Sequence, residues 1–186
     1  MKNIIFILVL FIFISPIFGA EYASKEGDLK VNANILQLGK KTVKAKNKIN
    51  VTAKLDNSTT INVKCNQLQI NASDEGSTSI KNLKNCIFRD SVIVKYDSVD
   101  SKGVKSSYLS KSDSAFYDGK TQNLVLTGNV KLDYISSDGT KMSAQGKKAV
   151  LNLSKDAKEN DIIFAIEGDE ETGAKLDSNL DRIPER

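Results

Sequence analysis

The chain has 186 residues, a length that suits a single domain of ordinary size. Its 27 Lys and Arg residues against 23 acids give a net charge of +4, which is spread along the whole sequence. Nucleic-acid binding needs cations gathered along a groove or a helix, so this composition gives no basis for it. The sequence has no His, the commonest general base and metal ligand, which disfavours enzymes and metal proteins.

Residues 1–20 are typical of a Sec export signal. Lys2 supplies a positive start, residues 4–14 form an unbroken apolar run, and a cut after Ala20 would release the mature chain. Phe18 then occupies the minus-three position, where a small residue is preferred, so an uncleaved anchor stays open as the alternative. It would be at the short end of the roughly 17 to 25 residues that span a bilayer. We expect export to the periplasm, or attachment to the inner membrane facing the periplasm.

The body of the chain, residues 21–176, alternates apolar and polar residues as β-strands do. Odd positions in 43–55 are mainly apolar, and even positions carry the apolar residues in 86–96 and 124–134. Proline, which cannot donate to a strand ladder, is absent between Ala20 and Pro184. Turn signals at 56–58, 73–76, 118–120 and 137–139 separate the runs. The body is therefore predicted to be all-β, and residues 177–186 to form a flexible polar tail.

Two short elements recur along the body and predict a repeated two-strand unit. Asn or Asp stands at positions 47, 85, 129 and 169, and between them the segments 65–71, 112–118 and 146–152 resemble one another. Gly128 interrupts an apolar row, and a glycine inside a strand often marks a bulge or a bend. We predict that Gly128 and Gly168 are corners where a strand turns between sheets, and that Lys46 and Lys84 occupy equivalent corners.

The run AFYDGKTQNLVLTGNVKLDY, residues 115–134, and the following GTKMSAQGKKAVLNLSKD resemble the OstA-type domain of the lipopolysaccharide transport protein LptA and its relatives. The resemblance covers residues 28–170. In its N-terminal part, Lys46 and Lys84 stand where the family commonly has glycine. The positions that match the family theme of Ala-x-Tyr-Asp, a turn and Leu-x-Gly-Asn-Val are Ala115, Tyr117, Asp118, Leu126, Gly128, Asn129 and Val130.

This resemblance implies an open, twisted β-jellyroll of stacked two-strand repeats with an apolar groove between two sheets. Such proteins carry lipopolysaccharide from the inner to the outer membrane and stack end to end, without covalent chemistry or a cofactor. The implied ligand is lipopolysaccharide or a related glycolipid. The implied partners are LptC-like and LptD-like jellyroll domains, or further copies of the chain arranged head to tail. Two alternatives stay open: an LptC-like component anchored in the inner membrane, and a structural or adhesive β-repeat protein without lipid.

Acyl chains can be held by an apolar lining alone, because their burial yields about 25 cal/mol per Å². The in-register apolar residues of the predicted strands are the candidate lining of such a lipid-binding groove. The same alternation is compatible with a filled core, so the pattern leaves both readings open. The candidates are Val43, Ala45, Ile49, Val51, Phe88, Val92, Val94, Leu124, Leu126, Val130, Leu132 and Leu151.

Cys65 and Cys86 are the two cysteines of the chain, and export to an oxidising compartment makes a disulfide between them plausible. It would contribute roughly 3 kcal/mol in the chain-entropy model, provided that adjacent strands bring the two Cα atoms within roughly 7 Å. Without His, neither cysteine is expected to bind metal or act as a nucleophile.

Two charged groups complete the candidates. Lys44, Lys46 and Lys48 share one face of a strand, where they either meet lipid phosphates or keep that face soluble. Glu167, Asp169, Glu170 and Glu171 lack the alternating ligands of a calcium loop, so we expect a solvated turn and no metal.

Overall fold

One antiparallel sheet makes up most of the described chain. The computed structural model describes residues 19–73, 80–99, 102–154, 164–168 and 173–178. In these ranges eleven strands follow the order β1-β2-β4-β5-β6-β7-β8-β9-β10, with β3 also paired to β4 and β11 to β9, which confirms the all-β prediction. The elements are β1 (Ala20–Ala23), β2 (Leu29–Ala33), β3 (Ile35–Leu38), β4 (Thr42–Lys54), β5 (Thr59–Ala72), the 3₁₀ turn η1 (Ile80–Asn82), β6 (Leu83–Val99), β7 (Lys105–Asp118), β8 (Asn123–Ser136), β9 (Lys141–Asn152), β10 (Phe164–Glu167) and β11 (Lys175–Ser178).

Several sequence predictions concern residues beyond these ranges. The expected signal segment at 1–18, the carboxylates at 169–171 and the tail from 179 onward lie outside the described residues. The expected boundary between body and tail, at 176 and 177, falls inside β11. Within the described ranges, no helix has the length and apolar character that a membrane crossing requires.

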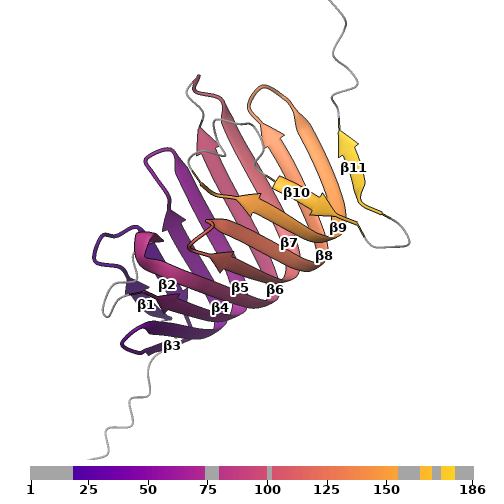
Figure 1. Cartoon of the computed structure of the whole chain (residues 1–186). Coiled ribbons are helices and arrows are strands. Elements are labelled where there is room, and N and C mark those ends of the chain that lie inside the picture. The colour runs from indigo at the N-terminus through magenta and orange to yellow at the C-terminus, as the bar shows by residue number, and fades with distance from the viewer. Residues whose placement is uncertain (1–18, 74–79, 100–101, 155–163, 169–172, 179–186) are drawn as a thin grey trace, which may run out of the picture.

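The long strands bend near their middle, along a line that crosses the sheet (Figure 1). On β4, β6 and β8, two residues face a single residue of the next strand, a β-bulge that bends and twists its strand. All six inserted residues have positive φ, between 47° and 76°, a region that Gly, Asn and Asp tolerate best. We call this bend the corner line. The bulges are Asn47–Lys48 facing Asn66, Asp90–Ser91 facing Asp113, and Gly128–Asn129 facing Lys147.

The other three long strands cross the corner line with their own repeated element. Cys65, Ser112 and Gly146 each precede the single residue that faces a bulge. The Cys65 thiol donates to the Gln67 carbonyl at 3.3 Å, and the Ser112 hydroxyl donates to the Ser114 carbonyl at 3.0 Å. The same side-chain bond thus spans the corner on β5 and β7. The predicted two-strand repeat is confirmed by these equivalent positions.

The edge strands are interrupted at the same line. β2 and β3 both pair with β4, on either side of Asn47, and β10 and β11 both pair with β9, on either side of Gly146. Gly168 directly follows Glu167, which pairs with Lys148 beside the corner of β9, so Gly168 lies at the corner line. The predicted corner at Gly128 is confirmed by its φ of 76° and by the register shift there.

The predicted corner at Lys84 is wrong. Lys84 lies at the start of β6, whereas that strand bends at Asp90–Ser91. Asn85 matches the recurring Asn or Asp of the sequence pattern, but the bulge lies at Asp90–Ser91, and no glycine precedes Asp90. Lys46 directly precedes the bulge of β4 but does not form it.

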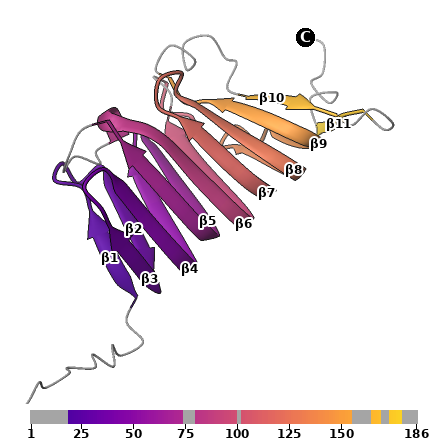
Figure 2. The ribbon, with the colours of Figure 1, turned by 60° about the horizontal axis from the view of Figure 1, so that its bottom comes forward.

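The corner line divides the sheet into two arms that face each other, with β1 and β3 at one end and β10 and β11 at the other (Figures 1 and 2). Apolar side chains of both arms fill the space between them as one continuous cluster. The first arm consists of β3, β10 and residues 42–46, 67–72, 83–89, 114–118, 123–127 and 148–152. The second arm consists of β1, β2, β11 and residues 49–54, 59–64, 92–99, 105–111, 130–136 and 141–145.

Candidate functional site

The space between the arms contains every residue that the sequence predicted as groove lining. None of them is more than 4% exposed, and all belong to the same apolar cluster. The first arm contributes Val43, Ala45, Phe88, Leu124, Leu126 and Leu151, and the second arm contributes Ile49, Val51, Val92, Val94, Val130 and Leu132.

With the exception of Leu151, these residues lie on β4, β6 and β8. On those strands the bulge inserts two residues, so inward-facing positions keep the same parity across the corner. Ala45 and Ile49 on β4 illustrate this, because both are odd-numbered and both are buried. A single alternating pattern therefore continues through the bend and is readable in the sequence.

The strands β5, β7 and β9 also line the interior, through residues that sequence reasoning missed. On β5 the buried positions are odd up to Cys65 and even from Leu68 onward. One residue, Asn66, occupies the corner there, so the inward parity reverses. A reversal of parity next to a polar residue is the signal that could have identified this lining. The missed residues on β5 are Ile61, Val63, Leu68 and Ile70.

Tyrosines form a second part of the lining that was not anticipated. Tyr96, Tyr108 and Tyr134 are cross-strand neighbours on the second arm. Their ring centroids are 5.6 Å apart for Tyr96 and Tyr108 and 4.7 Å apart for Tyr108 and Tyr134. Burial raises the pKa of the Tyr96 hydroxyl, so this group stays neutral near neutral pH.

An apolar cavity of about 50 Å³ lies between the arms. Val51, Phe88 and Leu124, all predicted as lining, form part of its wall. A water molecule in the liquid takes up roughly 30 Å³, so a cavity of this size has room for little more than one water molecule and not for a whole acyl chain. The arms would have to move apart to admit one. The remaining wall residues are Leu29, Ala53, Leu55, Ile61, Val63, Ile80, Leu83, Cys86, Tyr117 and Leu153.

A polar contact ties the free ends of the arms together beside this cavity. Asp28, in the turn between β1 and β2, accepts a hydrogen bond from the backbone N–H of Ile80 at 3.0 Å. The other oxygen of its carboxylate accepts one from the Ser24 hydroxyl at 2.5 Å. Ile80 belongs to the η1 turn that leads into the first arm, so Asp28 connects the two arms.

The predicted disulfide is not formed. Both thiols are free, and Cys86 lies opposite Ile70, five positions along β5 from Cys65. The two cysteines are therefore in different cross-strand rows, on either side of the corner at Asn66, and are not placed to form a disulfide. Burial raises the pKa of the thiol to about 11 at Cys65 and about 12 at Cys86. The two cysteines therefore act as neutral apolar side chains.

The three lysines that the sequence suggested as possible phosphate contacts do not face the apolar interior. Lys44 and Lys46 lie on the outer face of the first arm, and Lys48 is part of the corner bulge with a φ of 50°. Across the described residues, no group of three or more His, Cys, Asp or Glu side chains is placed to hold a metal ion.

These features define a class of protein: an open β-jellyroll whose two arms enclose a continuous apolar interior. The fold is of the LptA type. A similar solved structure is LptH of Pseudomonas aeruginosa, described as the LptA-homologous periplasmic component of the lipopolysaccharide transport device. The match has a TM-score of 0.54 and 13% sequence identity, and it covers 84% of this chain and 97% of that one. No protein-family model and no curated protein sequence matches this chain.

Proposed function

We propose that this protein binds the acyl chains of lipopolysaccharide or a related glycolipid between its two arms, and carries the lipid from the inner to the outer membrane. The observation that carries the proposal is the apolar interior, which continues across the sheet from β2 to β9 in a fold shared with LptH. An acyl chain gains about 25 cal/mol for each Å² of apolar surface it buries, so such an interior can hold one without a dominant contact.

Loading requires the arms to separate, because the present cavity of about 50 Å³ cannot take a chain. The contact between Asp28 and Ile80 is the polar tie that must break on the side of β1 and η1. A hydrogen bond to a charged group contributes about 1.5–3 kcal/mol, a cost that apolar burial of a chain can offset. Lipid binding and arm opening are thus coupled.

The location that we propose is the periplasm, with the jellyroll facing partners of the same fold. Among the described strands, those at both ends of the sheet have an unpaired edge for such stacking, and β3 exposes Ile35 by 46% and Leu38 by 63%. Backbone pairing at these edges would place the apolar interiors of neighbouring domains in line. The proposed partners are LptC-like and LptD-like jellyroll domains and further copies of this chain.

Lipid analysis tests the proposal. The protein is purified from its native host without detergent, extracted, and analysed by mass spectrometry for bound lipid. We expect a glycolipid with several acyl chains, at a substantial fraction of one per protein. A folded preparation that carries no lipid would contradict the carrier function and favour a structural or adhesive β-repeat protein.

A second observation separates the bridge from an anchored component. The mature N-terminus, read by intact mass, should begin near Glu21 if the export signal is cleaved. A chain that retains Met1 would support an LptC-like role in the inner membrane instead.

A further inference from the structure

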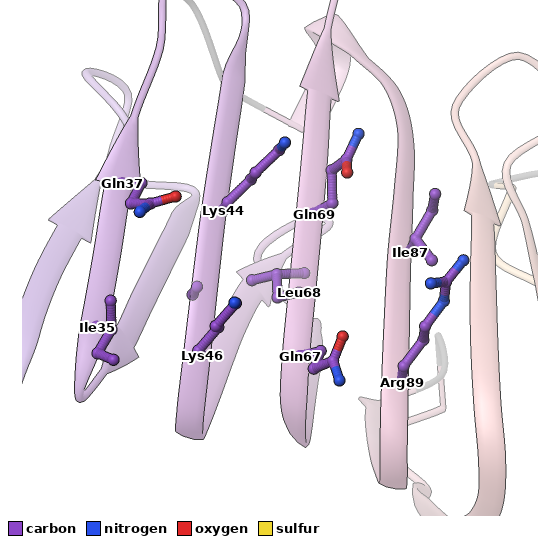
Figure 3. Close-up of a pocket in the computed structure, with 10 residues that line it drawn as sticks. Ile35, Gln37, Lys44, Lys46, Gln67, Leu68, Gln69, Ile87 and Arg89 are labelled. Atoms are coloured by element: carbon purple, nitrogen blue, oxygen red, sulfur yellow. The ribbon is translucent and has the colours of Figure 1, made fainter.

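The outer face of the first arm carries a hollow of about 270 Å³, on the opposite side of the sheet from the apolar interior (Figure 3). Side chains from β3, β4, β5 and β6 line it. Six of its ten lining residues are polar, whereas apolar side chains line the cavity between the arms. The polar ones are three cations, Lys44, Lys46 and Arg89, and three amides, Gln37, Gln67 and Gln69; the other four are Ile35, Ala45, Leu68 and Ile87.

The strand register explains how these groups come together. One cross-strand row aligns Gln37, Lys44 and Gln69, and the next aligns Lys46, Gln67 and Arg89. Adjacent strands are about 4.8 Å apart, so Lys46 and Arg89 leave the sheet roughly 10 Å from each other. Both side chains are long enough to meet a ligand that sits over Gln67 between them.

The lining of the hollow contains three cations and no acid, and the one carboxylate bonded to it is that of Asp90, which accepts a hydrogen bond from Gln67. Among the ion pairs that join described residues, none involves Lys44, Lys46 or Arg89. On the same face Lys148 pairs with Glu167 at 2.7 Å, so one cation elsewhere on this face does have a carboxylate partner. An anionic ligand would supply the missing charge.

The amides of the hollow are already oriented. The side-chain amino group of Gln67 donates to the Asp90 carboxylate at 2.6 Å, and that of Gln69 donates to the side-chain carbonyl of Asn71 at 3.1 Å. Each glutamine keeps a side-chain carbonyl that can accept a hydrogen bond from a hydroxyl group. Cations beside hydroxyl acceptors match a ligand that has both a phosphate and free hydroxyls.

We propose that this hollow binds a phosphorylated monosaccharide, with the phosphate held by Lys44, Lys46 and Arg89 and the hydroxyls by the glutamines. Arginine recognises phosphate through two parallel hydrogen bonds, and lysine adds point charges. The volume lies just below the roughly 300–1,000 Å³ of sites for drug-sized ligands, which suits one sugar unit. This site is independent of lipid binding between the arms, because the two lie on opposite faces of the sheet.

Amide chemical shifts of the full chain, labelled with ¹⁵N, test the site directly. Titration with glucose 6-phosphate should give saturable shifts confined to residues 44–46, 67–69 and 87–89, with glucose and inorganic phosphate binding more weakly. The variants K44Q/K46Q and R89Q should each weaken binding about tenfold, the effect of losing a charged hydrogen bond. The same amides are then titrated with a phosphorylated glycolipid in micelles. Tighter binding of the glycolipid than of glucose 6-phosphate would identify a lipid headgroup as the natural ligand, and tighter binding of the free sugar phosphate would identify a soluble ligand.

A matched control removes the same charge from another place. Lys111 and Lys131 face each other on the outer side of the second arm, away from the hollow. K111Q/K131Q should bind within about twofold of the unmodified chain, because distant sites act independently. Equal weakening in both double variants would overturn the proposal in favour of a general charge effect. Shifts that never saturate would overturn it as well. Neither outcome depends on whether lipid occupies the interior.

Discussion

Replacing Gly128 with Ala tests how the corner line is built. Gly128 has a φ of 76°, and a Cβ there would lie 2.9 Å from the Cβ of Asp113 and would contact its carboxylate. The left-handed conformation costs a non-glycine residue about 1–2 kcal/mol. Overpacking against Asp113 adds about 1–3 kcal/mol, because two Cβ atoms this close require a backbone shift. We expect G128A to lower the free energy of unfolding by about 2–5 kcal/mol.

Gly139 provides the matched control. It has a φ of 95° in the turn between β8 and β9, and an added Cβ would meet nothing within 4 Å. G139A therefore carries the conformational cost of about 1–2 kcal/mol alone. Urea unfolding followed by circular dichroism gives the free energy of unfolding of both variants. The effect of the Gly-to-Ala change on the unfolded chain is the same in both, so it cancels in the comparison. If G128A costs no more than G139A, the packing of the corner against Asp113 is not what the structure indicates.

Three further predictions concern the interior. In urea unfolding, F88A should lower the free energy of unfolding by about 3–5 kcal/mol, and F116A by far less, because Phe88 is 4% exposed and Phe116 is 41% exposed. Similar decreases in the two variants would contradict the inward placement of Phe88. The buried Cys86 thiol has its pKa raised from 9.0 to about 12, so its stabilisation is complete below pH 9 and is lost as the pH rises toward 12. From pH 8 to pH 10, the free energy of unfolding should therefore fall by about 1 kcal/mol more in the unmodified chain than in C86V. Equal decreases in the two proteins would refute the burial of the thiol. D28A removes the hydrogen bond to Ile80, so an apolar fluorescent probe should enter the interior faster than in the unmodified chain. The control is D138A, because the Asp138 carboxylate accepts a hydrogen bond within its own turn, from Thr140. Equal entry rates in the two variants would show that the Asp28 contact is not a barrier to entry.

The sequence allowed the all-β class and the two-strand repeat to be predicted, because alternation and corner residues are local signals. The bulge at Gly128–Asn129 was recognised through its glycine. The equivalent bulge at Asp90–Ser91 was missed, since those residues reach positive φ without a glycine to mark it. Local composition thus identifies a corner only where the backbone conformation restricts the residue type.

The lining was predicted for β4, β6 and β8 and largely missed for β5, β7 and β9. The reason is geometric: two inserted residues preserve the inward parity, and one inserted residue reverses it. The strand register also explains why the predicted disulfide is not formed, because the two cysteines are 21 residues apart in the sequence but lie in distant rows of β5 and β6. The cationic hollow could not be predicted either, because Arg89 joins Lys44 and Lys46 only through strand pairing.

Photo-cross-linking in the cell shows whether acyl chains lie between the arms. A benzophenone amino acid is placed at Phe88, which faces the interior, or at Phe116, which is on the outer face of the same arm. After irradiation in the cell, intact-mass measurement should show a lipid adduct at position 88 and none at position 116. Equal adducts at both positions, or none at position 88 in a folded protein, would show that acyl chains do not lie between the arms.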